Sequence, residues 1–211
     1  NYLKDNNCSH GYDHTAFDPY TSTMFSFMNA NRFVSTLPFG GSAWVQKNFG
    51  ASPNVSTQVM GQSSGIDFWT GAFPGSSGHG VWMLYDCGAF QDGVNDLVGK
   101  NGQLIFYDPT MDAFLPDIVG FGNPGGSGLQ CFAEYSPMAN NAVFGGGGGI
   151  NWQKVWRLNA DRTVTHMPDF PGGSTLGVGV QLGFVFPDPV TGKFLALNNR
   201  HLWQLDQSGS G

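Results

Sequence analysis

Charged side chains are scarce in this sequence, and basic ones are the scarcest. Only 11% of the 211 residues are Asp, Glu, Lys or Arg, against about 25% in average proteins. Nine Lys and Arg against fifteen Asp and Glu leave a net charge of −6. A chain with so few basic residues offers neither a patch for the phosphate backbone of nucleic acid nor a polybasic segment for anionic lipid. We therefore expect no nucleic-acid partner.

Long apolar runs and cysteine pairs are also missing. No stretch approaches the roughly eighteen apolar residues of a membrane-spanning helix, so we expect no membrane span. The three cysteines, Cys8, Cys87 and Cys131, allow at most one internal disulfide, and their spacing is not that of a metal-binding pair. Their pairing stays open between three free side chains and one disulfide.

Glycine and aromatic residues are abundant instead. The chain has 32 glycines, 14% aromatic residues and 40% hydrophobic residues. Glycine is the poorest helix former after proline, whereas aromatic residues favour strands. The composition predicts an all-β protein of short strands joined by tight turns.

The clearest structural unit lies between residues 131 and 167. Four short apolar runs, at 131–135, 141–144, 155–158 and 163–167, are separated there by Pro, Asn, Gly and Asp. Short runs bounded by turn-forming residues predict a four-stranded antiparallel meander.

The same order of runs recurs along the chain with a period of roughly fifty residues. We predict repeats at 8–50, 79–120, 128–171 and 178–211, with a Gly/Ser-rich insert at 51–78. In the second repeat, strands are expected at 81–86, 96–98, 104–107 and 113–115. Four-stranded units with this period are typical of the blades of a β-propeller, whereas the alternative, a β-sandwich, does not require the same order four times.

Turn chemistry supports the repeat. Asp18-Pro19 and Asp188-Pro189 follow the first apolar runs of their repeats. Proline fixes φ at the second position of a turn, and an Asp side chain can accept from the backbone two residues on. Both dipeptides predict a hairpin between first and second strands.

The third repeat resembles the kelch and galactose-oxidase-like propellers. Phe144-Gly145-Gly146 places a diglycine after its second apolar run, and Trp156 lies on its third. The resemblance implies a kelch-like propeller fold and nothing about activity.

The fourth repeat is incomplete. Leu202-Trp203 aligns with Val155-Trp156 on a third strand, and no fourth apolar run follows. An unpaired strand edge exposes N–H and C=O groups that must be covered. Three sources of the missing strand stay open: residues 1–7, a neighbouring subunit, or further blades of a longer chain.

Two sets of residues are candidates for binding. His10, Tyr12 and His14 would share one face of a strand, and His79 has a similar entry position in the second repeat. Imidazole groups can bind copper or zinc, here through His10 and His14 if at all, or act as acid and base. Alternatively, these side chains satisfy backbone groups at the blade entrance, and no cofactor is present.

Trp69 and Trp152 form the second set, in Gly/Ser-rich segments without a strand pattern. An exposed aromatic ring in a loop can stack on a sugar or anchor a protein contact. No complete catalytic constellation accompanies either set. The sequence therefore favours a non-catalytic binding or structural module, displayed outside cells or on a particle such as a virion or filament, with a glycan or protein ligand. The alternative is a propeller enzyme, either a copper oxidase or a polysaccharide lyase.

Overall fold

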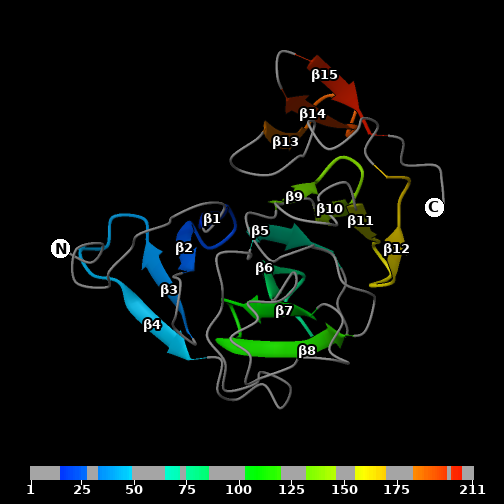
Figure 1. The fold of residues 1–211 in the computed structure, drawn as a ribbon. Helices are drawn as coiled ribbons and strands as arrows, with labels where there is room; N and C mark the ends of the chain where they lie inside the picture. The colour runs from blue at the N-terminus through cyan, green and yellow to red at the C-terminus, as the bar shows by residue number, and fades with distance from the viewer. Residues whose placement is uncertain are drawn as a thin grey trace, which may run out of the picture.

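Every regular element that the computed structural model describes is a β-strand (Figure 1). The description covers residues 15–27, 33–48, 65–71, 75–85, 103–119, 132–145, 155–169, 183–198 and 201–205. No helix in this part of the chain is long and apolar enough to cross a bilayer.

The strands form four antiparallel sheets, each paired in chain order. Blade 1 contains β1 (Thr15–Asp18), β2 (Thr23–Phe27), β3 (Phe33–Pro38) and β4 (Val45–Asn48). Blade 2 contains β5 (Gly65–Thr70), β6 (His79–Tyr85), β7 (Gln103–Asp108) and β8 (Ala113–Val119). Blade 3 contains β9 (Phe132–Ser136), β10 (Asn141–Gly145), β11 (Val155–Leu158) and β12 (Val164–His166). Blade 4 contains β13 (Gly183–Pro187), β14 (Phe194–Asn198) and β15 (His201–Gln204).

The first strands of the blades lie next to one another. β1 contacts β5, β5 contacts β9, and β9 contacts β13, so the four sheets are arranged about these inner strands (Figure 1). This arrangement is a β-propeller, and the predicted all-β propeller of four antiparallel blades is confirmed.

The strand assignment in the second repeat was wrong. β5 lies inside the segment expected to be an insert, and the run beginning at Val81 belongs to the second strand, not the first. β5 and β6 pair from Gly65↔Leu84 to Thr70↔His79. The glycines on both sides of the run Ile66–Trp69 concealed its alternation. The strand expected at 96–98 lies outside the described residues.

Hydrophobic clusters between neighbouring blades form the core. The cluster between blades 2 and 3 is rich in aromatic residues, among them Trp69, Trp82, Phe106, Phe144 and Trp156. Smaller clusters join blade 1 to blade 2 and blade 3 to blade 4. Successive side chains of a strand point to opposite faces of the sheet. A blade with a neighbour on each side therefore buries both faces of its sheet. On β10, for example, Phe144 packs toward blade 2 and Val143 packs toward blade 4.

Candidate functional site

Four hairpins of the propeller share one loop form. In the hairpins from β1 to β2, β7 to β8, β9 to β10 and β13 to β14, a turn of four residues has the same form each time; these turns are residues 19–22, 109–112, 137–140 and 189–192. Each loop follows Asp or Ser, begins with Pro and ends with a residue of positive φ; these final residues are Ser22 (51°), Asp112 (53°), Asn140 (48°) and Gly192 (73°). The hairpins predicted at Asp18-Pro19 and Asp188-Pro189 are confirmed, and the other two loops separate strands that the sequence analysis also expected as neighbours.

The side chain before each proline holds its loop. A carboxylate oxygen of Asp18 accepts from the Tyr20 N–H at 2.9 Å, and that of Asp188 accepts from the Val190 N–H at 2.9 Å. In blade 3 the hydroxyl of Ser136 accepts from the Ala139 N–H at 3.2 Å. Such bonds fix the backbone of a turn, so the loops present their outer side chains in defined positions.

Asp108 holds its loop most firmly. Burial alone would raise the pKa of its carboxyl, but hydrogen bonds from Ser77, Met111 and Thr110 outweigh burial and lower the pKa below its ordinary value. The Ser77 bonds also tie the segment that leads into β6 to this loop.

The four loops, 19–22, 109–112, 137–140 and 189–192, lie at the same end of the propeller, which we call the turn face. A Cβ at Gly192 would lie 3.0 Å from the Ala139 nitrogen, so the loops of blades 3 and 4 touch. A Cβ at Gly71, directly after β5, would lie 3.5 Å from the Asn140 side chain. Blades 2 and 3 therefore also meet at this face.

His79 joins blades 1 and 2 on the turn face. Its Nδ1 lies 3.0 Å from Oδ2 of Asp18, and its Nε2 lies 3.1 Å from the hydroxyl of Thr110. Tyr20 stacks on the imidazole, with ring centroids 4.7 Å apart. If the proton is on Nδ1, His79 donates to Asp18 and accepts from Thr110, which uses both ring nitrogens.

The order carboxylate, imidazole, hydroxyl is that of a hydrolase triad. An acyl-transfer site also needs N–H groups free to hold an oxyanion. The N–H groups of Thr110 and Met111, those nearest in sequence to the hydroxyl, both donate to Asp108 instead. The arrangement is therefore suited to holding Tyr20 and the two loops in place.

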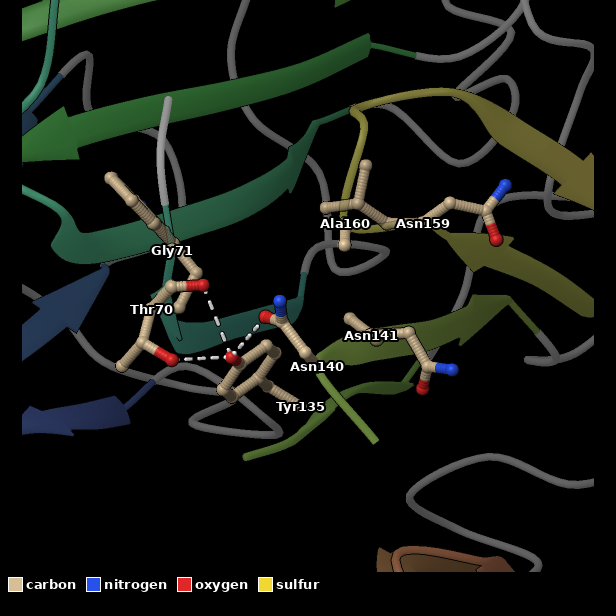
Figure 2. Close-up of a pocket in the computed structure, with 10 residues that line it drawn as sticks. Thr70, Gly71, Tyr135, Asn140, Asn141, Asn159 and Ala160 are labelled. Atoms are coloured by element: carbon tan, nitrogen blue, oxygen red, sulfur yellow. Dashed lines mark hydrogen bonds between the residues drawn. The ribbon is translucent and has the colours of Figure 1, made fainter. Parts of the chain in front are cut away.

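A small pocket opens between blades 2 and 3 (Figure 2). The Tyr135 hydroxyl lies 3.1 Å from the Thr70 carbonyl oxygen and 2.9 Å from Oδ1 of Asn140. Burial raises the pKa of the Tyr135 phenol, although hydrogen bonds with Thr70 act in the opposite direction. The pocket volume is about 20 Å³, which is room for about one water molecule.

The candidate residues from the sequence have different outcomes. His79 lies on the turn face, as described. Trp69 was wrongly placed in an exposed loop: it lies on β5, is 2% exposed and belongs to the core between blades 2 and 3. Burial leaves its ring no free face for a sugar.

His10, Tyr12, His14 and Trp152 lie outside the described residues, and their proposed roles stay predictions. Among the residues that are described, no group of three or more His, Cys, Asp or Glu side chains could hold a metal ion.

The sequence analysis missed the apolar side chains of the turn face. Each of the four loops exposes one: Tyr20 (64%), Met111 (51%), Met138 (63%) and Val190 (77%). Phe39 is 84% exposed, and its N–H donates to the carbonyl oxygen of Ser22, which places it beside the first loop. An apolar residue in the middle of an Asp-Pro or Ser-Pro turn was the available signal.

Comparison with known proteins supports the fold alone. No family model and no curated protein matches the sequence. Solved structures that are similar include an auxiliary nutrient binding protein of Bacteroides thetaiotaomicron (11% identity, 95% of this chain and 40% of that one, TM-score 0.52), a putative phosphatase of the same species (12%, 90% and 40%, 0.53) and the Dos1 propeller (11%, 95% and 50%, 0.50). This chain spans less than two thirds of the length of each.

Proposed function

We propose that this chain is a non-catalytic propeller module that binds a protein ligand through its turn face, outside cells or on the surface of a particle. The observation that carries the proposal is the set of five exposed apolar side chains on loops that hydrogen bonds hold in place: Tyr20, Phe39, Met111, Met138 and Val190. Aromatic residues and Met are enriched in protein interfaces.

The chemistry of this face favours a protein over a glycan. Sugar sites combine polar groups with exposed aromatic rings. The turn face exposes two such rings, Tyr20 and Phe39, but the other three of its five exposed side chains, Met111, Met138 and Val190, are not aromatic. The pocket between blades 2 and 3 has room for only about one water molecule, and Trp69 is buried. Apolar side chains on preformed loops suit a partner that contributes apolar side chains of its own, because little conformational entropy is lost on binding.

We also propose that the propeller is kelch-like and that its role is binding. A kelch-like origin is supported by an apolar β10 that ends at Gly145 and by Trp156 on β11. A binding role is supported by analogy with the nutrient binding protein that shares the propeller fold, an argument from fold alone.

Selection of peptides from a random display library on the purified protein tests the proposal. Synthetic monomeric copies of the selected peptides are then titrated against wild type and a Tyr20→Ser/Phe39→Ser/Met138→Ser variant. We expect binding at least about tenfold weaker for the variant, because apolar and aromatic residues dominate such interfaces.

The control is Val45→Ser, which removes a half-exposed apolar side chain on the outer strand β4. Peptides that bind all three proteins equally, or no enriched peptide, would contradict a protein ligand at this face. Binding on a glycan array that Trp152→Ala abolishes would support the glycan ligand instead.

A further inference from the structure

Blade 1 has an apolar face on the side away from blade 2. Ala16, Phe25 and Val34 pack toward blade 2, so the alternating residues of the same strands point the other way. Phe17, Met24 and Leu37 lie opposite one another on β1, β2 and β3. Phe17 is 44% exposed and Met24 is 42% exposed. These three residues form an apolar row across the sheet, which we call the blade 1 row.

Blade 4 has a matching row on the side away from blade 3. Val185, Phe194 and Ala196 pack toward blade 3, and the alternating positions Phe184, Leu197 and Leu202 lie opposite one another on β13, β14 and β15. Phe184 is 55% exposed and Leu202 is 60% exposed. We call these three residues the blade 4 row.

Both rows occupy positions that are buried where a neighbouring blade is present. All five described side chains of β7, Leu104 to Asp108, are buried, as are three of the four on β11. On β15, the third strand of blade 4, three of the four side chains are exposed. The inner strands contact one another from β1 to β13 in succession, but no comparable contact joins β13 to β1 among the described residues. The two rows therefore do not cover each other.

We propose that a second copy of this chain covers both rows, with blade 4 of each copy packed against blade 1 of the other. In the described part of the propeller, each blade presents one side to the blade before it and the opposite side to the blade after it. Pairing of blade 4 with blade 1 continues this pattern, and a two-fold axis then repeats the contact so that the ring closes.

Size and composition both favour a second copy. The chain spans 40 to 50% of the similar propeller structures, so two copies supply 80 to 100% of the length of one of those proteins. The six residues of the two rows are all apolar, and contiguous apolar surface of this kind is rarely left exposed on a monomer.

The molar mass of the 211-residue chain in solution, measured by light scattering after size-exclusion chromatography, gives the first test. We expect twice the monomer mass of 22.7 kDa. A monomer over the whole accessible concentration range, as expected if further blades of a longer chain cover the rows, would overturn the proposal. An open-ended polymer would overturn the closed ring.

Two variants and their mixture test which faces meet. Met24→Asp and Leu202→Asp are each expected to weaken the dimer at least about tenfold, because a charge would be buried in the contact. An equimolar mixture should recover dimer, since one of its two contacts contains only wild-type rows. Phe17→Asp with Phe184→Asp provides a second pair if either variant fails to fold.

Val190→Asp on the turn face is the control, and it should remain dimeric. Row variants that keep the wild-type dimer, or a mixture that stays monomeric, would exclude the contact between blade 4 and blade 1.

Discussion

Asp18 and His79 belong to different blades and are joined by a hydrogen bond of 3.0 Å between Oδ2 and Nδ1. The Asp18 carboxylate is fully buried, and the His79 side chain is 13% exposed. Asp18 also accepts from the Thr21 hydroxyl at 2.8 Å. One side chain thus fixes its own loop and the start of β6 in the next blade. It also holds His79 where Tyr20 stacks on it.

Loss of this link should destabilise the propeller. We expect Asp18→Ala and His79→Ala each to lower the free energy of unfolding by about 1–3 kcal/mol, because each leaves a buried polar partner without its bond. In a double-mutant cycle measured by urea unfolding, the two changes should be coupled by at least about 0.5 kcal/mol. Additive effects would show that the pair contributes nothing beyond its separate contacts.

Thr110→Ala is the matched control for this cycle, because its hydroxyl bonds the other nitrogen of the same imidazole near the surface. It should cost about 1 kcal/mol or less. A loss as large as that of Asp18→Ala would contradict the central role of the carboxylate.

Asp108 should make stability depend on pH in the acid range. Its pKa in the folded chain is lower than the ordinary value of 3.8, so the folded state favours the ionised form. The resulting stabilisation is fully present above pH 3.8 and is lost as the pH falls through the lower folded value. We expect Asp108→Asn to flatten the decline in unfolding free energy below about pH 4, as measured by urea titrations at several pH values. If Asp108→Asn shows the same decline in unfolding free energy as wild type, other carboxyl groups cause the decline.

The sequence predicted the elements that depend on local chemistry. The meander of blade 3 and the turn after Asp188 were both readable, because alternation and turn residues act within a few positions. β5 was missed because glycines surround Ile66–Trp69, and this error left Trp69 in a loop. The bond between Asp18 and His79 was not predictable, since it joins residues from two blades whose spacing carries no information about contact.

The exposure of apolar side chains on the turn face could not be predicted from the sequence either. Tyr20 and Val190 occupy the same loop position as Met138, but whether an apolar residue at that position is buried depends on the neighbouring blade. The sequence alone therefore pointed to histidines and tryptophans, which are chemically distinctive, and not to the side chains that the loops expose.

The last residue of the repeated loop should respond differently in different blades. Ser22 and Gly192 both have positive φ. Ser22→Gly should change stability by no more than about 0.5 kcal/mol, because relief of backbone strain offsets the added flexibility of the unfolded chain. Gly192→Ser should cost about 1–3 kcal/mol, since the new Cβ would lie 3.1 Å from Cβ of Met138. Thermal unfolding of both variants measures the difference, and equal effects would refute the close contact between the loops of blades 3 and 4.

The Tyr135 hydroxyl should stabilise the folded chain at neutral pH, and this stabilisation should be lost in strong base. It lies between Thr70 of blade 2 and Asn140 of its own blade (Figure 2). Tyr135→Phe should lower the unfolding free energy by about 1–2 kcal/mol at pH 7, because the single phenolic O–H and the oxygen that bonds the Thr70 hydroxyl are both lost.

The pH dependence gives an independent check on the same residue. Burial raises the pKa of the Tyr135 phenol above its ordinary value of 10.0, so the folded state favours the neutral form. Its contribution is complete below pH 10.0 and is lost as the pH rises through the folded value. Urea titrations above pH 10 should therefore show a smaller decline for Tyr135→Phe than for wild type. Parallel declines would mean that the phenol is as free to ionise in the folded chain as in the unfolded one.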